Sequence, residues 1–331
     1  MKPLKEKNTM INYSDDKVAL DAFHEKYGIL RKEIAKVIVG QDETVKHVLI
    51  SIFSRGHGLL VGVPGLAKTL LVNTISDVMG LSYSRIQFTP DLMPSDILGT
   101  EILDENRKFR FIKGPIFANI ILADEINRTP PKTQSALLEA MQEKAVTVAG
   151  QHYLLPDPFF VLATQNPIEQ EGTYPLPEAQ LDRFMFNIWL DYPSFEEELA
   201  VVKNTTGGQI PSTGIVISAE EIVYFQQLIR RIPVPENVFR YAVGLASKTR
   251  PNTADGHKWS DQYLTWGAGP RASQYLILGA KCHAAVNGKY APDIEDVQAV
   301  APSILRHRIV RNYKAEAEGI GVDHIVAELL K

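Results

Sequence analysis

Cysteine is almost absent from this chain of 331 residues. The single one, Cys282, lies in a broadly apolar stretch with helical character, near Leu276, Leu278 and Ala280. A lone cysteine forms no disulfide within the chain and supplies no thiolate cluster for a metal ion. We therefore expect Cys282 to be buried and reduced. A disulfide-stabilised scaffold and a cysteine-based metal site are both excluded.

Long apolar runs and an excess of positive charge are also missing. The chain has no run of 18 apolar residues, and the polar segment after Met1 lacks the apolar core of a signal peptide. Its 35 lysine and arginine residues are outnumbered by 39 aspartate and glutamate residues, for a formal net charge of −4. Proteins that bind duplex nucleic acid usually carry a basic surface. We therefore expect a cytoplasmic protein without a membrane span, and nucleic acid is disfavoured as a partner.

A phosphate-binding loop is predicted at residues 62–69, which read Gly-Val-Pro-Gly-Leu-Ala-Lys-Thr. The segment follows a short apolar strand and opens a helix with one apolar face, the context that such a loop requires. The glycines let backbone N–H groups turn inward, and the helix N-terminus adds its positive dipole end. Lys68 is expected to reach the β- and γ-phosphates, and the Thr69 hydroxyl to bind Mg²⁺. The nucleotide-binding residues predicted in and after the loop are Gly62, Val63, Pro64, Gly65, Leu66, Ala67, Lys68, Thr69 and Leu70.

One position of the loop departs from the usual pattern. Ala67 stands where a glycine normally precedes the lysine. Alanine costs little there if the residue is already helical, because alanine is a good helix former. We interpret Ala67 as a variant that preserves the loop, with helical backbone. The alternative is a Gly-Pro turn that only happens to precede Lys-Thr.

A second motif decides between these alternatives. The apolar segment 120–123 ends in Asp124 and Glu125 and resembles a Walker B strand. Asp124 is expected to hold the metal ion, and Glu125 to polarise the attacking water. Together with the phosphate-binding loop, this pair of carboxylates predicts hydrolysis of a nucleoside triphosphate.

The order of the predicted elements divides the chain into two domains. Strand candidates alternate with helices up to residue 190, which predicts a mostly parallel sheet covered on both faces. After Pro193 the pattern is helical, and no further strand is expected. We assign residues 1–16 to a flexible N-terminal segment, 17–193 to an α/β nucleotide-binding domain and 194–331 to a helical domain. Strands are predicted at 59–61, 84–88, 120–123, 159–164 and 184–190, and later helices at about 195–204, 218–231, 236–249, 270–286, 294–306 and 322–330.

Two segments of the α/β domain are predicted to be inserted β-hairpins. Each has turn-forming residues between two β-prone arms. The hairpins either decorate the sheet or project into a channel and contact a substrate, and the sequence leaves both readings open. The arms are residues 101–103 with 108–112, and residues 145–148 with 153–155.

Asn166 follows the strand predicted at 159–164. If this strand lies beside the one that ends at Asp124, the Asn166 amide reaches the γ-phosphate or the attacking water. The alternative is a structural role, in which Asn166 and Pro167 only form a turn.

Three arginines are further candidates for a phosphate contact. Arg183 stands at the start of the last strand, and its alternative role is a surface ion pair with Asp182. Arg271 follows Pro270 and is expected in the first turn of a helix, where it opposes the helix dipole. It therefore needs an anionic partner, either a phosphate or a carboxylate. Arg128 comes shortly after the carboxylate pair and is a further cation near that strand end.

These motifs together resemble the MoxR family of AAA+ ATPases. The matching stretches occur in the family's order from about residue 60 to 273, and the helical remainder resembles the family's lid. They read GVPGLAKT from Gly62, FTPDLMPSDILG from Phe88, GPIFANIILADEINRTPPKTQSALLEAM from Gly114, ATQNP from Ala163, EGTYPLPEAQLDRF from Glu171 and PRAS from Pro270.

The resemblance implies a fold and roles for individual residues. The fold is an AAA+ P-loop core with a five-stranded parallel sheet, hairpin insertions in helix 2 and before sensor 1, and a small helical lid. By position, Asn166 is sensor 1 and Arg271 is sensor 2, contributed by the lid. Arg183 is the arginine finger offered to a neighbouring subunit, a role for which Arg128 could compete. ATP and Mg²⁺ are the implied cofactors, and Val39 and Gly40 are expected to flank the adenine.

The resemblance also implies a ring-forming ATPase, by expectation a hexamer, that remodels, matures or activates client proteins, often with a von Willebrand A-domain partner. Two other functions stay open. A nucleic-acid motor is one, because related AAA+ branches with similar hairpins drive helicases, but the acidic balance of the chain disfavours it. A scaffold that binds ATP without turnover is the other, but the presence of Asp124, Glu125 and Asn166 argues against it.

Overall fold

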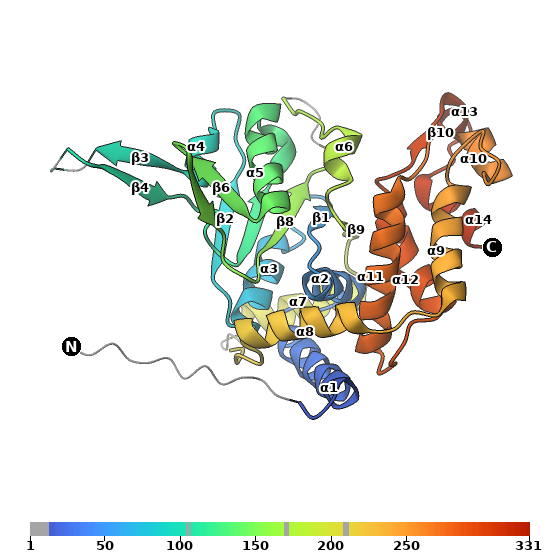
Figure 1. The fold of residues 1–331 in the computed structure, drawn as a ribbon, viewed down its shortest axis with the longest axis horizontal. Coiled ribbons are helices and arrows are strands. Elements are labelled where there is room, and N and C mark those ends of the chain that lie inside the picture. Colours follow the sequence, from blue (N-terminus) through green and yellow to red (C-terminus); the bar gives the residue numbers. More distant parts are fainter. Residues whose placement is uncertain (1–12, 104, 106, 169–171, 208–211) are drawn as a thin grey trace.

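The centre of the computed structural model is a five-stranded parallel sheet (Figure 1). The structure describes residues 13–103, 105, 107–168, 172–207 and 212–331. The strand order is β2-β5-β8-β1-β9, and every neighbouring pair is parallel. β8 therefore lies between β5 and β1, which meets the condition set in the sequence analysis for Asn166 to lie near Asp124. The strands are β1 (Gly58–Val61), β2 (Tyr83–Gln87), β5 (Ile120–Asp124), β8 (Phe160–Gln165) and β9 (Phe186–Trp189).

Helices cover both faces of this sheet because its central strands are apolar up to their C-terminal ends. Residues 120–123 of β5, for example, are all fully buried. Leu60 and Leu162 belong to a buried cluster on one face, whereas Leu59 and Val161 belong to a cluster on the other. The first face packs on α1 (Asp16–Ala35), α2 (Asp42–Phe53) and α3 (Lys68–Val78), and the second on α4 (Pro94–Leu98) and α5 (Pro131–Glu143).

Both predicted hairpins are present, and they contact each other. β3 (Gly99–Leu103) pairs with β4 (Phe109–Lys113), and β6 (Ala145–Val148) pairs with β7 (Gln151–Leu154), both antiparallel. The β3–β4 hairpin projects away from the sheet (Figure 1). The rings of Phe111 and Tyr153 stack with their centroids 4.2 Å apart, which holds the two hairpins together. Asp104 and Asn106, in the first predicted turn, lie outside the described residues.

The C-terminal part is helical, but the expectation of no strand after residue 190 is wrong. β10 (Leu264–Trp266) and β11 (Val310–Arg311) form a short antiparallel ribbon. Strands of two or three residues are too short to produce a readable alternation of apolar and polar residues. The short helices α10 and α13 were missed for the same reason. The helices are α7 (Phe195–Thr206), α8 (Ala219–Arg231), α9 (Glu236–Lys248), α10 (Lys258–Tyr263), α11 (Pro270–Val286), α12 (Ile294–Leu305), α13 (Tyr313–Ala317) and α14 (Val322–Leu330).

The start of the chain is ordered earlier than the sequence analysis expected. α1 begins at Asp16, and Asp15 caps it by accepting a hydrogen bond from the backbone N–H of Val18. The ring of Tyr13 packs 5.5 Å from that of Tyr224 in α8. Residues 13–16 are therefore attached to the folded body, and residues 1–12 of the predicted flexible segment lie outside the described residues.

The helical part shares its core with one face of the sheet. A single cluster of buried apolar side chains extends from α1 through the sheet to α14. α8 lies against α1 and α2, where Lys26 Nζ is 2.5 Å from Glu221 Oε1 and Gln226 Nε2 donates to the carbonyl of Ile52. A hinge motion between the sheet and these helices would expose the shared apolar surface to water, which costs free energy.

Three successive residues after α12 bind the outer edge of the sheet. β9 is the edge strand, so the backbone groups on its outer side need partners. Arg306 Nη1 donates to the carbonyl of Asn187 at 2.9 Å, and the His307 ring nitrogen Nε2 donates to the carbonyl of Phe184 at 3.0 Å. Arg308 Nη2 also donates to the carbonyl of Phe184, at 2.6 Å. Side chains of the helical part thereby cover the edge strand.

His57 makes the stability of the fold depend on pH. Its Nδ1 accepts a hydrogen bond from the backbone N–H of Val161 in β8, so Nε2 carries the proton and donates to the carbonyl of Met141. Burial lowers the pKa of His57 from its usual 6.5 to about 4. Between these values the unfolded chain binds a proton that the folded chain does not. The stabilisation is therefore complete above pH 6.5 and is lost as the pH falls toward 4.

We predict that protonation of His57 in the unfolded state destabilises the fold by about 3 kcal/mol between pH 6.5 and pH 4. In His57→Gln the amide can replace both hydrogen bonds but does not titrate. Thermal unfolding measured across this range should therefore show a shallower fall of the melting temperature for His57→Gln than for the wild type. Parallel curves for the two proteins would contradict the assignment.

Candidate functional site

The predicted phosphate-binding loop connects β1 to α3 and borders an open cavity. Lys68 is the first residue of α3, and its Nζ donates to the carbonyl of Gly62 at 2.5 Å, across the loop. Burial lowers the pKa of Lys68, while the Asp124 and Glu125 carboxylates act in the opposite direction. The cavity has a volume of about 430 Å³, and its lining residues are Pro64, Gly65, Ala67, Lys68, Thr69, Leu70, Asp124, Glu125 and Asn166.

The backbone at Ala67 differs from the helical conformation expected from the sequence. Ala67 has φ 53° and ψ 27°, in the left-handed region, and precedes the first residue of α3. A side chain in this region costs roughly 1–2 kcal/mol relative to glycine-compatible geometry, because Cβ approaches the neighbouring carbonyl oxygen. This backbone conformation explains why a glycine usually occupies the position. Ala67 adopts the same conformation and is therefore strained.

Asp124 is held at the tip of β5 by two neighbouring strands. Its Oδ1 accepts a hydrogen bond from the Thr164 hydroxyl of β8 at 2.6 Å. Its Oδ2 accepts from Arg85 of β2, at 3.1 Å from Nε and 2.6 Å from Nη2. Asp124 and Thr164 are buried. Because both oxygens are oriented, the carboxylate has a fixed direction at the edge of the cavity.

Glu125 has left-handed backbone and a carboxylate that already has partners. Its φ is 58°, and its backbone N–H donates to the Thr164 hydroxyl oxygen at 2.8 Å. Oε2 accepts from Gln87 Nε2 at 3.0 Å and lies 3.1 Å from Arg128 Nε. Thr164 thus links Asp124 and Glu125, whereas Gln87 and Arg128 hold the Glu125 side chain at the β2 side of the site.

Asn166 forms the turn that the sequence analysis gave as its structural role, and it also lines the phosphate cavity, where a contact with phosphate or water stays a prediction. Its Oδ1 accepts a hydrogen bond from the backbone N–H of Ile168 at 3.1 Å, which forms the turn after β8. Because the oxygen serves this turn, the side-chain amide nitrogen is the end that can donate elsewhere. Asn166 is buried and lines the cavity opposite Lys68 and Glu125.

The residues predicted to flank the adenine lie beside the loop but outside the phosphate cavity. Val39 and Gly40 connect α1 to α2, and neither lines the cavity. The next residue, Gln41, donates from Nε2 to the carbonyl of Leu66 at 3.2 Å, which ties this connection to the phosphate-binding loop. Leu66 itself is buried in the core. A role of Val39 and Gly40 in adenine binding stays a prediction.

Arg183 and Arg271 lie together in a different recess, of about 290 Å³, and neither lines the phosphate cavity. Arg271 is in the first turn of α11, as expected, and its anionic partner is a carboxylate, with Nη1 2.8 Å from Asp182 Oδ2. The structure therefore does not bring Arg271 to the phosphate-binding loop of its own subunit, because Asp182 holds it elsewhere. The other residues that line the recess are Arg55, His57, Met141, Gln142, Lys144 and Tyr275.

Arg183 does not form the surface ion pair with Asp182 that was the alternative interpretation. Both Asp182 oxygens are already bound, Oδ2 by Arg271 and Oδ1 by Arg308 Nε at 2.8 Å. Within the part of the chain that the structure describes, the guanidinium of Arg183 has no hydrogen-bond or ion-pair partner. The Arg183 guanidinium therefore remains available to bind an anion. The recess that it lines carries four cationic side chains, those of Arg55, Lys144, Arg183 and Arg271.

Sequence reasoning missed Arg85, Gln87 and the hydroxyl of Thr164. Thr164 lies within the quoted Ala163–Pro167 motif, so its polar side chain in an apolar strand was a readable signal. Arg85 and Gln87 alternate along β2, and only the adjacency of β2 and β5 brings them to the two carboxylates. That adjacency is a property of the fold and has no local sequence signal.

The strand order and the geometry of the cavity together are those of the AAA class of P-loop ATPases. Two family models agree. The model described as "ATPase family associated with various cellular activities (AAA)" matches residues 57–186, and the AAA lid domain model matches residues 257–329.

Individual relatives narrow the class. Chaperone MoxR1 of Mycobacterium tuberculosis is 44% identical over 300 residues, covering 90% of this chain and 79% of the relative. Protein MoxR of Methylorubrum extorquens is 30% identical over 84% of this chain and 85% of the relative. A crystal structure from Cytophaga hutchinsonii, described as an ATPase, has a TM-score of 0.88 and 44% identity over 94% of this chain and 95% of that one. The chain belongs to the MoxR family of AAA+ ATPases.

Membership of this family supports ATPase activity in general, with nucleotide and Mg²⁺ as cofactors. Within the described residues, no group of three or more His, Cys, Asp and Glu side chains forms a preformed metal site. None of the helices in the described ranges is long and apolar enough to cross a membrane.

We expect Thr164→Val to lower the free energy of unfolding by about 1–3 kcal/mol, because the Glu125 N–H loses its acceptor and Asp124 loses a donor. The substitution preserves shape, so packing should change little. Thr164→Ser, which keeps the hydroxyl, is the matched control. Thermal unfolding should rank the wild type and Thr164→Ser above Thr164→Val, and equal melting temperatures for Ser and Val would contradict the bridging role.

Proposed function

We propose that this protein is a Mg²⁺-dependent ATPase whose active sites are completed between neighbouring subunits of a ring, and that it uses ATP hydrolysis to remodel client proteins. The observation that carries the proposal is the separation of the predicted machinery into two sites. Lys68, Asp124, Glu125 and Asn166 line the phosphate cavity, whereas Arg183 lines another recess. This separation supports a role of Arg183 toward a neighbouring subunit, whereas Arg85 and Arg128 are engaged with the carboxylates of their own cavity.

The phosphate cavity has the groups that hydrolysis of ATP requires. Lys68, now bound to the carbonyl of Gly62, is placed to exchange this partner for the β- and γ-phosphates. Thr69 and Asp124 are the oxygen ligands on the two sides of the cavity that would hold Mg²⁺, which neutralises charge on the phosphates when bound. The Asn166 amide nitrogen is placed to donate to the γ-phosphate or to the attacking water.

Glu125 needs to change partners before it can act as a base. In the arrangement described here, its carboxylate accepts from Gln87 and pairs with Arg128. Its Oε2 is therefore occupied by partners on the β2 side of the site. We infer that hydrolysis requires Glu125 to turn from β2 toward the water beside the γ-phosphate, with the Thr164 bond to its backbone N–H retained.

The client-directed part of the proposal rests on two supports. A relative that is 44% identical bears the name chaperone. The β3–β4 hairpin projects from the body and exposes Phe109 and Leu103, with 74% and 57% of their surfaces accessible. Exposed apolar side chains on a projecting hairpin suit contact with another protein. On the basis of the family resemblance, we also propose that the ring is a hexamer and that a von Willebrand A-domain protein is a partner.

We expect Lys68→Ala to abolish ATP binding, because it removes the cation that faces the triphosphate. Glu125→Gln should bind ATP with wild-type affinity but hydrolyse it at least about 10²-fold more slowly, because an amide cannot accept the proton of water. Isothermal titration and a phosphate-release assay separate the two effects. Unchanged ATP affinity in Lys68→Ala would contradict the assignment of the cavity, and normal turnover in Glu125→Gln would contradict the assigned base.

The trans role of Arg183 is tested by mixing subunits. Arg183→Ala should retain ATP binding and lose about 10³–10⁵ in turnover. In an equimolar mixture with Lys68→Ala, about a quarter of the head-to-tail interfaces combine an intact loop with an intact arginine, so hydrolysis should return to about a quarter of the wild-type rate.

Arg128→Ala mixed with Lys68→Ala is the matched control and should show no more turnover than its Arg128→Ala subunits give alone, because Arg128 lies beside the Glu125 of its own subunit. Tags on each variant establish that the subunits assemble together. Recovery with Arg128→Ala and not with Arg183→Ala would transfer the trans role to Arg128.

A further inference from the structure

The backbone around Arg183 is held by the helical part of the same subunit, while the Arg183 side chain has no hydrogen-bond or ion-pair partner among the residues that the structure describes. Four successive carbonyls, those of residues 182–185, accept hydrogen bonds from lid side chains. Arg308 donates to the carbonyls of Asp182 (2.9 Å), Phe184 (2.6 Å) and Met185 (3.3 Å), and the Tyr275 hydroxyl donates to the carbonyl of Arg183 at 3.3 Å. Such a backbone cannot shift without breaking several bonds at once.

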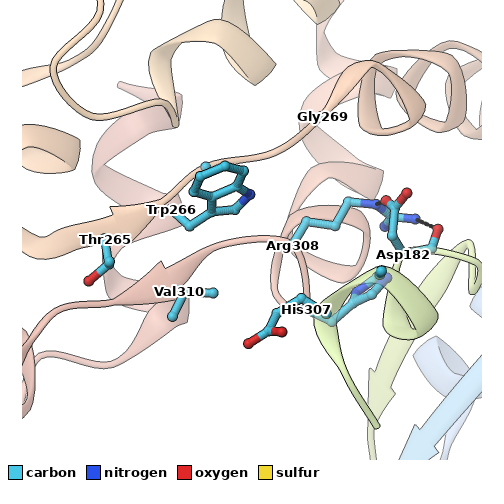
Figure 2. Close-up of a pocket in the computed structure, with 10 residues that line it drawn as sticks. Asp182, Thr265, Trp266, Gly269, His307, Arg308 and Val310 are labelled. Atoms are coloured by element: carbon cyan, nitrogen blue, oxygen red, sulfur yellow. Dashed lines mark hydrogen bonds and ion pairs between the residues drawn. The ribbon is translucent and has the colours of Figure 1, made fainter.

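Asp182 connects these interactions. Its Oδ1 is 2.8 Å from Arg308 Nε, and its Oδ2 is 2.8 Å from Arg271 Nη1. Figure 2 shows Arg308 reaching across to Asp182, next to a recess of about 600 Å³ that Trp266 and His307 also line. The Arg308 side chain is 1% exposed, and its guanidinium lies 5.1 Å from the centre of the Tyr275 ring. We call Asp182, Arg271, Tyr275 and Arg308 the Asp182 cluster.

The Asp182 cluster has a consequence for the neighbouring arginine. An exposed arginine beside an unpaired aspartate commonly forms a local ion pair with it. Here Arg271 and Arg308 occupy both oxygens of Asp182, so this carboxylate is not free to bind Arg183. Stability alone is a poor explanation for burying the Arg308 charge in this group, because an apolar side chain of similar volume is often as stabilising.

We propose that Asp182 is a positioning residue of the intersubunit active site, and this proposal rests on the trans role of Arg183 proposed above. By binding Arg271 and Arg308 of the lid, Asp182 fixes the backbone that carries Arg183 and leaves the Arg183 guanidinium free to reach the phosphate of the next subunit. The lid of one subunit thereby sets the position of the arginine that is offered to its neighbour. Movement of the lid would be transmitted across the interface through residues 182–185.

The test uses Asp182→Asn, which keeps the shape of the side chain and removes its charge. We expect turnover to fall by about 10²-fold, the effect typical of a catalytic group displaced by about 1 Å, with unchanged ATP affinity. Hydrolysis should be partly restored by mixing Asp182→Asn with Lys68→Ala, which supplies intact arginines. It should not be restored by mixing with Arg183→Ala, because both variants are then defective on the same side of the interface.

Asp323→Asn is the matched control. Asp323 pairs with Arg306, which also binds the β9 edge, at 2.7 Å, but it does not contact Asp182 or Arg183. Its turnover should equal that of the wild type. If Asp182→Asn does not fold, Tyr275→Phe takes its place, because it removes only the hydroxyl that donates to the Arg183 carbonyl. Tyr275→Phe should lower turnover about fivefold to tenfold, in line with the loss of one hydrogen bond. Mixing it with Lys68→Ala or Arg183→Ala should give the same pattern of restoration as for Asp182→Asn.

The outcomes separate this proposal from the one it rests on. Normal turnover in Arg183→Ala would overturn the trans role of Arg183 itself. The positioning role alone would be overturned if Arg183→Ala loses turnover but folded Asp182→Asn keeps the wild-type rate. Where Tyr275→Phe replaces Asp182→Asn, a wild-type rate in that variant would have the same meaning. Restoration of Asp182→Asn by Arg183→Ala but not by Lys68→Ala would also overturn it, because the defect would then lie on the nucleotide side.

Discussion

The arrangement of this protein depends on how the outer edge of its parallel sheet is covered. An edge strand exposes backbone groups that need hydrogen-bond partners. The side chains of Arg306, His307 and Arg308, just after α12, donate hydrogen bonds to carbonyls of β9 and of the residues just before it. These bonds, together with the apolar cluster shared between the sheet and the lid, fix the lid against β9. The lid is therefore placed beside the edge of the sheet, and its Arg271 binds Asp182 there and not the phosphate-binding loop of the same subunit.

This placement explains the division of the candidate site. The groups that bind and activate the nucleotide come from β1, β5 and β8, which lie next to one another, so their tips meet at one cavity. Arg183 and Arg271 come from the segment before β9 and from the lid, and they meet at a second recess. Under the proposed function, each of the two places carries one half of an active site, and a head-to-tail assembly would join a cavity of one copy to a recess of the next.

The sequence predicted those parts of the fold that have local signals. Apolar strands, helical periodicity and the turn residues of both hairpins were sufficient for the sheet, the main helices and the cavity residues Lys68, Asp124, Glu125 and Asn166. The short strands β10 and β11 and the short helices α10 and α13 were missed because no periodicity can be read from them. The left-handed backbone of Ala67 and the pairing of Arg271 with Asp182 were missed because both depend on tertiary packing. The contacts of Arg85 and Gln87 likewise require the pairing of β2 with β5.

The central claim is that the recess with Arg183 completes the active site of a neighbouring copy. The most direct test is an experimental structure of the assembled Glu125→Gln protein with ATP and Mg²⁺, in which the distance from the Arg183 guanidinium to the nearest γ-phosphate is measured. We expect a hydrogen-bond distance of about 2.7–3.0 Å to the nucleotide of the adjacent subunit. An assembly in which the Arg183 guanidinium faces solvent, or in which the lid covers the nucleotide of its own subunit, would contradict the account.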